Sequence, residues 1–194
     1  MPITEKLLEA TVKNQLVQYL ENNKILTDIQ SGFRKGHSCE TSLNFVIANW
    51  KATINNIKVI VPVFLGFKRA FETIDRNIFI SKLKSYGIIG TEANWFKSYL
   101  QDRRQPTFYG TAACSPPLLN MHGVPQGSVL GPLLFVLYIN DTSSTVKHGS
   151  LNLFADDTLL TVGTDNVDNA IDKVNEDWNA YTGWSDLRCI STKG

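Results

Sequence analysis

The sequence predicts a single domain of mixed α and β structure in which strands pack on helices. Helical patterns of apolar residues alternate with short, β-prone apolar runs along the 194 residues. No internal repeat, low-complexity tract or linker divides the chain. A chain of this length can bury a sizeable core. Its hydrophobic share of 43% and charged share of 19% are ordinary for a globular protein.

The first third of the chain predicts two helices, a loop and a strand. Apolar residues recur at helical spacing over residues 5–22 and again over 40–55. Between them, residues 30–35 (Gln-Ser-Gly-Phe-Arg-Lys) form a basic loop that is able to hold a phosphate group. The apolar run from Val59 to Phe67 predicts a strand that is buried on both faces. Pro62 inside this run indicates a bulge or a weakened edge.

Helices and short strands are expected to follow. Residues 68–86 predict a helix that stops at Gly87, and residues 94–101 predict a second, shorter helix. Two strands are expected at residues 105–109 and 118–121, around a connection rich in Gly, Pro and Ser.

The last third of the chain begins with a glycine-containing loop at residues 123–128. An apolar helix is expected at residues 131–140, because Pro132 suits a first helical turn. A β-hairpin is expected at residues 151–162, and a final helix at residues 166–181.

Asp156 and Asp157 lie in the middle of this hairpin, where the turn is expected. Two adjacent carboxylates repel each other unless something neutralises them. The pair alone has two interpretations. It is a solvated turn, or it is a divalent-metal site, because hard carboxylate oxygens suit magnesium.

Charge is distributed unevenly along the chain, although the net charge is only +1. Residues 24–104 carry 13 Lys and Arg against 6 Asp and Glu, whereas residues 141–194 carry 4 against 9. A basic front and an acidic back are typical of a protein that holds a polyanion on one surface and a metal near another. Ordinary solvated faces give the same pattern.

Several classes of protein are excluded. There is no signal peptide, and the longest apolar run, residues 129–139, is too short to cross a bilayer. We therefore expect an intracellular protein of the cytoplasm or nucleus, with no membrane contact. Cys39, Cys114 and Cys189 form no Cys-x-x-Cys pair, which argues against a disulfide framework or a zinc site. A P-loop is excluded because Gly-x-x-x-x-Gly-Lys-Ser/Thr does not occur.

Taken in order, the motifs resemble those of reverse transcriptases, most closely the non-LTR (LINE-like) retrotransposon polymerases. The motifs that carry the resemblance are Gln30-x-Gly32-Phe33-Arg34, Ala70-Phe71, Gly123-Val124-Pro125-Gln126-Gly127-Ser128-x-x-Gly131-Pro132, Tyr138-Ile139-Asn140-Asp141 and Phe154-Ala155-Asp156-Asp157. The resemblance is specific and covers essentially all of residues 1–194 as one reverse transcriptase domain.

The resemblance implies an α+β fold, the right-hand polymerase palm, in which a small antiparallel sheet packs on helices. Part of the fingers is expected, whereas the thumb, the upstream fingers and any endonuclease are expected to be missing. The implied activity is RNA-directed DNA polymerisation, with an RNA template, a DNA primer and deoxynucleoside triphosphates as partners. The implied cofactors are two Mg²⁺ ions about 3.5–4 Å apart, for which Mn²⁺ is a possible substitute.

The resemblance also assigns residues. Asp156 and Asp157 match the paired catalytic metal ligands, with Asp156 the stronger ligand. Phe71 matches the bulky aromatic residue that excludes a ribonucleotide 2′-hydroxyl group by steric contact.

Four further residues match positions near the nucleotide. Gln126 and Gly127 match the loop that contacts the incoming nucleotide and the template. Arg34 matches a fingers residue near phosphates, and Lys193 matches a lysine close to the triphosphate.

One departure matters for activity. In the family, the strand before the Ala70-Phe71 motif ends in an aspartate that is the third metal ligand, and the matching residue here is Gly66. Glycine has no side chain to bind a metal, and Glu72 and Asp75 are expected on the following helix, pointing elsewhere. We therefore expect weak or absent polymerase activity in a decayed retroelement copy or gene fragment. The same match to the family's motifs predicts that Gly66 faces the Asp156–Asp157 turn from a neighbouring strand.

Two alternatives remain open at this point. The first is a non-catalytic nucleic-acid-binding remnant that uses the basic 24–104 region. The second is a two-metal nuclease, which needs further acids near the hairpin. Asp141, expected at a helix end, is the only nearby upstream candidate.

Overall fold

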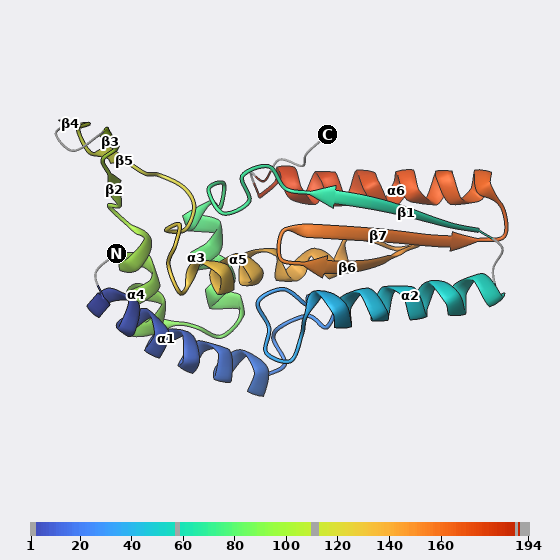
Figure 1. Cartoon of the computed structure of the whole chain (residues 1–194), viewed down its shortest axis with the longest axis horizontal. Helices are drawn as coiled ribbons and strands as arrows, with labels where there is room; N and C mark the ends of the chain where they lie inside the picture. Colours follow the sequence, from blue (N-terminus) through green and yellow to red (C-terminus); the bar gives the residue numbers. More distant parts are fainter. Residues whose placement is uncertain (1–2, 57–58, 110–112, 189, 191–194) are drawn as a thin grey trace.

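A three-stranded antiparallel sheet forms one half of the molecule, to the right in Figure 1. We describe it from a computed structural model, in which residues 3–56, 59–109, 113–188 and 190 are described. The strands are β1 (Val59–Gly66), β6 (Ser150–Phe154) and β7 (Asp157–Thr164), in the order β1-β7-β6.

The β6–β7 hairpin forms where the sequence predicts it, around Asp156 and Asp157. Leu153 pairs with Thr158 and Phe154 with Asp157, so that Ala155 and Asp156 form the turn. The central strand β7 is buried along most of its length. The acidic pair therefore lies at the exposed end of a well-buried strand.

One helix covers each face of this sheet (Figure 1). On one face, Tyr181 of α6 (Val167–Asp186) donates a hydrogen bond from its hydroxyl to Thr158 Oγ1 at 3.1 Å. On the other face, Trp50 of α2 (Cys39–Asn56) donates from its indole N–H to Thr161 Oγ1 at 3.2 Å. Thr158 and Thr161 point to opposite faces because side chains alternate along a strand.

Strand β1 differs from its prediction. It pairs only with β7 and forms an edge of the sheet. Most of its residues are half-buried, and Phe64 is 75% exposed, so the prediction of burial on both faces was wrong. An apolar run cannot distinguish an edge strand from a central one, because both are rich in the same residues. Pro62 is tolerated for the reason expected, since an edge strand can lack a donor.

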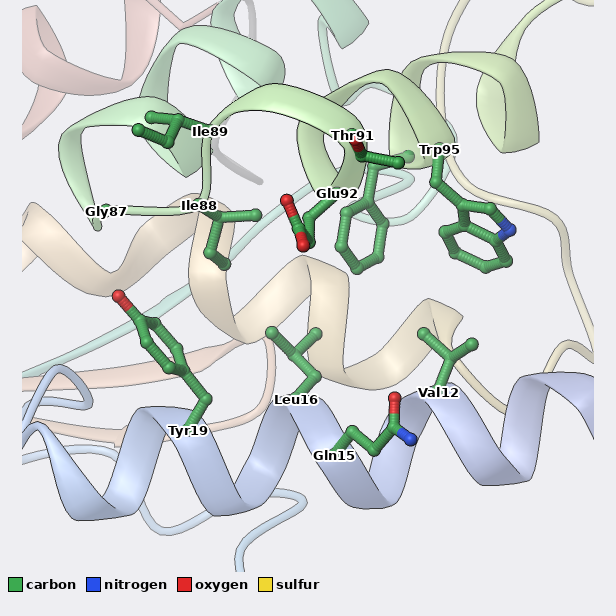
Figure 2. Close-up of a pocket in the computed structure, with 11 residues that line it drawn as sticks. Val12, Gln15, Leu16, Tyr19, Gly87, Ile88, Ile89, Thr91, Glu92 and Trp95 are labelled. Carbon is green, nitrogen blue, oxygen red and sulfur yellow. The ribbon is translucent and has the colours of Figure 1, made fainter.

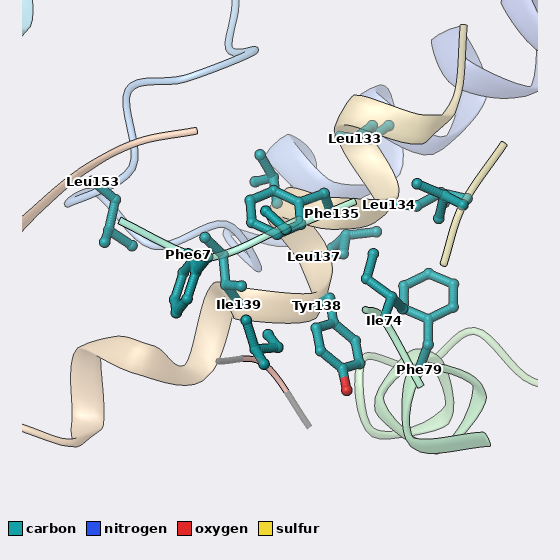
Figure 3. Packing of buried hydrophobic residues seen from close by; sticks show 14 of the residues in the cluster. Phe67, Ile74, Phe79, Leu133, Leu134, Phe135, Leu137, Tyr138, Ile139 and Leu153 are labelled. Carbon is teal, nitrogen blue, oxygen red and sulfur yellow. The ribbon is translucent and has the colours of Figure 1, made fainter. Parts of the chain in front are cut away.

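The main core surrounds α5 (Gly131–Ile139), which is buried on almost all sides (Figure 3). Phe67, Ile74 and Phe79 pack around it and are at most 1% exposed. The remaining helices are α1 (Ile3–Asn22), α3 (Arg76–Ser85), α4 (Gly90–Leu100) and the short 3₁₀ helix η1 (Asn140–Ser144). Pro132 lies in the first turn of α5, as predicted.

The helix predicted over residues 68–86 is shorter than expected. α3 begins only at Arg76, because Asp75 caps it by accepting hydrogen bonds from the backbone N–H groups of Asn77 and Ile78 at 2.8 and 3.0 Å. Residues 68–72 form turns, in which Arg69 has a φ of 53°. Glu72 and Asp75 therefore precede the helix and do not lie within it.

The described residues after α4 form short ladders that extend away from the sheet (Figure 1). β2 (Arg104–Gln105) pairs with β5 (Leu118–Leu119), and β3 (Phe108–Tyr109) pairs with β4 (Ala113–Cys114). The two longer strands predicted here were wrong in extent, because prolines interrupt the ladders.

Candidate active site at the acidic turn

The carboxylates of Asp156 and Asp157 are the centre of the candidate site. Asp156 is half-buried in the turn, and Asp157 is the exposed first residue of β7. Within the described part of the chain, neither carboxylate has a hydrogen-bond or ion-pair partner. Two like charges lie next to each other without a protein cation, which favours binding a cation from solution.

Gly66 lies directly across from this pair. The β1–β7 register pairs the Cα of Gly66 with that of Asp157, as the sequence predicted. Directly paired residues share a face of the sheet, so a side chain at position 66 would stand beside Asp157. Gly66 is not among the residues with positive φ, so its backbone conformation is open to any residue.

The donors present do not fit a site for two divalent ions. Among the described residues, no group of three or more His, Cys, Asp or Glu side chains is placed to hold a metal. Mg²⁺ takes one or two protein carboxylates and completes its shell with water and phosphate oxygens, so two adjacent carboxylates suit one ion, whereas the described residues offer no third carboxylate to share with a second. The acids that follow Gly66 most closely in the sequence have other partners. Asp75 caps α3, and Glu72 accepts a hydrogen bond from Gln126.

Phe71 is half-buried and contacts two other aromatic rings. Its ring centroid is 4.8 Å from that of Phe135 and 6.4 Å from that of Phe33, which meets it edge-on. Its carbonyl accepts a hydrogen bond from Val124 N–H at 2.9 Å. The approach needs Gly123, because a Cβ there would lie 2.6 Å from the Phe71 carbonyl oxygen. Residues 123–128 therefore dock on the segment that carries Phe71.

Gln126 and Gly127 stand at the surface of the same loop. The Gln126 amide donates a hydrogen bond to Glu72 Oε1 at 2.7 Å. Gly127 has a φ of 74°, and nothing lies within 4 Å of a Cβ placed on it. A ligand can thus approach its backbone closely.

Arg34 is engaged within its own loop. Its side chain is only 10% exposed, and its guanidinium pairs with Glu21 at 3.1 Å and donates to the Thr27 carbonyl at 2.9 Å. These contacts leave a phosphate little access to it. Lys193 lies outside the described residues.

The sequence patterns assigned no role to Gln30, although it belongs to one of the motifs. Gln30 is 1% exposed, and its side-chain amide bonds to both backbone groups of Ala155, the first residue of the turn. The motif that contains Gln30 was the one sequence signal for its role, but Ala155, which Gln30 contacts, lies 125 residues away.

A basic cleft of about 760 Å³ opens beside Gln126. Its lining includes three arginines, one histidine and one acid: Arg76, Arg103, Arg104, His122 and Glu72. Arg76 donates to three backbone carbonyls, those of Asn120, His122 and Gly123. Burial and the nearby charge of Arg103 lower the pKa of Arg76.

The charge of this cleft is only partly neutralised. Among the described residues, neither Arg76 nor Arg104 has a carboxylate partner, whereas Arg103 pairs with Glu5 at 3.3 Å. The single acid in the lining, Glu72, is shared with Gln126 and Arg69. The basic cleft is therefore suited to an anion.

Asp141 does not contribute to the acidic pair. Its carboxylate oxygens lie 2.5 Å from Lys82 Nζ and 2.5 Å from an Arg188 guanidinium nitrogen. Burial acts to raise the pKa of Asp141, but the hydrogen bonds and charges of Lys82 and Arg188 outweigh it and lower the pKa. With both oxygens paired, Asp141 supplies no free ligand for the two-metal nuclease alternative.

A separate, mostly apolar cavity of about 630 Å³ lies between α1 and α4 (Figure 2). Leu16, Tyr19, Ile88 and Trp95 line it together with neighbouring residues. It shares no lining residue with the acidic turn or the basic cleft. None of the helices formed by the described residues has the length and apolar character that crossing a membrane requires.

Comparison with known proteins gives a consistent family. Residues 1–185 match the family model described as reverse transcriptase (RNA-dependent DNA polymerase). The chain is 28% identical over 192 residues to a probable RNA-directed DNA polymerase from transposon BS of Drosophila melanogaster, covering 92% of this chain and 20% of the relative. It is 27% identical over 195 residues to the corresponding protein from transposon X-element of the same species, covering 95% and 21%. The chain thus spans about a fifth of the length of these relatives.

Solved structures show a similar fold at low sequence identity. Apo telomerase from Candida tropicalis aligns with a TM-score of 0.58 and 13% identity, covering 95% of this chain and 40% of that one. Telomerase from the same species, in complex with a TWJ fragment of telomeric RNA, aligns with a TM-score of 0.64 and 11% identity, covering 93% and 32%. The observed sheet and helices agree with part of the palm of such an enzyme.

Proposed function

The chain belongs to the reverse transcriptase (RNA-dependent DNA polymerase) family, and we propose that it is the palm and part of the fingers of such an enzyme, with an incomplete metal site. The ancestral reaction is the addition of deoxynucleotides to a DNA primer on an RNA template. In this chain the reaction is expected to be weak or absent.

The pairing of Gly66 with Asp157 carries this proposal. Divalent cations, when bound, neutralise the charge that develops on the transferred phosphoryl group. Asp156 and Asp157 offer their oxygens to such a cation, but the strand beside them offers none. Removing a group that stabilises charge in the transition state typically costs about 10²–10³ in rate.

The remaining roles follow from the surroundings of the acidic pair. Phe71 packs on Phe135 in a position from which it can limit the space at the nucleotide sugar. Gln126 and Gly127 present an open backbone and a polar side chain to a base or a phosphate. The proposed partners, RNA and DNA, place the protein in the cytoplasm or nucleus.

Primer extension tests the proposal. The unmodified chain is compared with Gly66→Asp and with Gly66→Asn, a control of equal size that carries no charge, on poly(rA)/oligo(dT) with Mg²⁺ or Mn²⁺. We expect extension to rise by a factor on the order of 100 in Gly66→Asp alone. Robust extension by the unmodified chain would show that the missing ligand is not limiting.

Metal binding gives a second measurement that does not require activity. Mn²⁺ affinity, followed by electron paramagnetic resonance, should be at least about tenfold tighter in Gly66→Asp than in the unmodified chain, because a further carboxylate joins the site. Gly66→Asn should change it little. Equal affinity in all of these proteins would contradict the assignment of position 66 as a ligand position.

A second candidate function is nucleic-acid binding without chemistry, and the basic cleft favours it. Arg104 is exposed and has no carboxylate partner among the described residues, so it is free to contact a phosphate. Binding to an RNA/DNA hybrid should weaken with salt, and Arg104→Ala should reduce the slope of log K against log salt by about 1. Lys51→Ala, an exposed cation on α2 outside the cleft, is the control. Tight binding with no extension even in Gly66→Asp would select this function.

A further inference from the structure

The acidic turn has a backbone conformation that its own residues do not favour. Ala155 has a φ of 56°, in the left-handed region that non-glycine residues rarely adopt. Such a conformation is strained and persists only where the surroundings impose it. Asp156 and Asp157 follow directly, and their mutual repulsion adds nothing that would hold the turn in place.

The side chain of Gln30 imposes this conformation. Its Oε1 accepts hydrogen bonds from Ala155 N–H at 3.0 Å and from Gly32 N–H at 2.6 Å. Its Nε2 donates to the Ala155 carbonyl at 3.3 Å. A neutral amide thereby satisfies both polar groups of the turn residue without adding charge next to the carboxylates.

The backbone around Gln30 is itself fixed to β6. Leu153 donates its N–H to the Ile29 carbonyl at 2.8 Å, and Leu153 accepts from Ser31 N–H at 2.8 Å. Residues 29–31 thus lie parallel to the outer side of β6. The Gln30 side chain continues this contact beyond Leu153 to the turn.

Gly32 and Arg34 make the arrangement possible. A Cβ on Gly32 would lie 2.1 Å from the Ala155 nitrogen, so no larger residue fits without moving the turn. Arg34 fixes the far side of the loop by donating to the carbonyls of Thr27 and Gln30. The Gln30-x-Gly32-Phe33-Arg34 motif therefore supports the hairpin from the side.

We propose that Gln30 is a positioning residue of the acidic site, which sets the backbone of Ala155 and so the direction of the Asp156 and Asp157 carboxylates. The inference rests on the proposed function, in which these carboxylates hold a divalent cation. Residues that orient metal ligands from behind typically change metal affinity by about 10–100-fold.

The test uses Gln30→Met, which keeps the length of the side chain and removes its three hydrogen bonds. The control is Asp177→Asn. Asp177 is buried and accepts hydrogen bonds from the backbone N–H groups of Lys147, His148 and Gly149, at the opposite end of β6. Both substitutions should lower the stability of the hairpin, but only Gln30→Met removes contacts with the acidic turn.

Mn²⁺ affinity is measured in the Gly66→Asp chain with and without each variant. Gln30→Met should weaken binding about tenfold, whereas Asp177→Asn should change it less than about twofold. Urea denaturation of the same proteins reports their stability. The proposal is overturned if both variants weaken binding equally, or if Gln30→Met leaves it unchanged.

Hydrogen exchange separates this proposal from the proposed function. In a chain that keeps Gly66, Gln30→Met should accelerate hydrogen exchange of the Ala155 amide at least about tenfold, because this amide loses its hydrogen-bond acceptor. Asp177→Asn should not accelerate it. If Gly66→Asp gains no Mn²⁺ affinity, the proposed function fails, and an unchanged Ala155 exchange rate in Gln30→Met would overturn the positioning role independently.

Discussion

Asp141 and the Asp156–Asp157 pair are carboxylates in opposite circumstances. Asp141 has a cation on each oxygen, and these cations, Lys82 and Arg188, lie 5.5 and 4.6 Å from the ring of Trp184. The acidic turn has no such partner among the described side chains. A carboxylate that the protein itself neutralises belongs to the scaffold, whereas the acidic pair lacks a protein cation, and on this difference our proposal of a metal site depends.

The largest expected effect is at Asp141. Asp141→Ala leaves Lys82 and Arg188 close together, largely buried and without an acid. We expect a loss of about 2–3 kcal/mol in the free energy of unfolding, below the full value for a buried pair because Asp141 is partly exposed. Urea denaturation measures it, and Mn²⁺ affinity in the Gly66→Asp chain should stay unchanged. A loss below about 0.5 kcal/mol would show that Asp141 is not a scaffold residue.

Lys82 gives the same cluster a pH dependence. Burial lowers the pKa of Lys82 to about 8, although the hydrogen bond to Asp141 acts to raise it. The unfolded chain therefore binds the proton more readily, and this group makes stability rise as the pH increases from about 8 toward the ordinary lysine value. The stability of the unmodified chain relative to Lys82→Met should increase across that range, by an amount on the order of 1 kcal/mol. A constant difference would contradict the lowered pKa.

Adding a carboxylate beside the acidic turn should change the stability by a smaller amount, and the change should depend on Mg²⁺. Gly66→Asp places a further negative charge beside Asp157, and without divalent ions we expect it to lower stability by about 0.5–1 kcal/mol. Millimolar Mg²⁺ should reverse the loss, because a ligand that binds the folded state stabilises it. Thermal unfolding with and without Mg²⁺ measures both effects. Gly66→Asn, which adds no charge, should show no response to Mg²⁺.

The smallest effect is expected for the acidic pair itself. Asp156→Asn and Asp157→Asn remove charges that no described residue neutralises, so stability should change by less than about 0.5 kcal/mol. The same substitutions should abolish the Mn²⁺ affinity gained in Gly66→Asp. A stability loss above about 1.5 kcal/mol would place these carboxylates with Asp141 as scaffold.

Much of the site could be predicted because short stretches of sequence determine the elements that carry it. Two β-prone apolar runs predict the hairpin around Asp156 and Asp157, and the family resemblance of the segment before Ala70 and Phe71 predicted Gly66 opposite Asp157, where the strand register places it. The helix predicted over residues 68–86 begins too early in the prediction, because Asp75, which could continue a helix, instead caps α3 at its start.

Contacts distant in sequence could not be predicted. Nothing near Gln30 indicates that its amide meets Ala155, because the contact exists only once residues 29–31 lie against β6. The same holds for Arg34, whose ion pair with Glu21 could not be read from the sequence and whose predicted phosphate contact stays a prediction. Composition could not reveal that β1 is an edge, since that depends on which strands pair with β7.

The extended conformation of Gly66 has a consequence for inheritance. A glycine codon that ends in a pyrimidine becomes an aspartate codon by a change of its middle base alone. The strand already holds this position opposite Asp157 in a conformation that any residue adopts. Under the proposed function, a gene that encodes Gly66 with such a codon is therefore one point mutation away from the third carboxylate, and the backbone at this position needs no rearrangement to accept it.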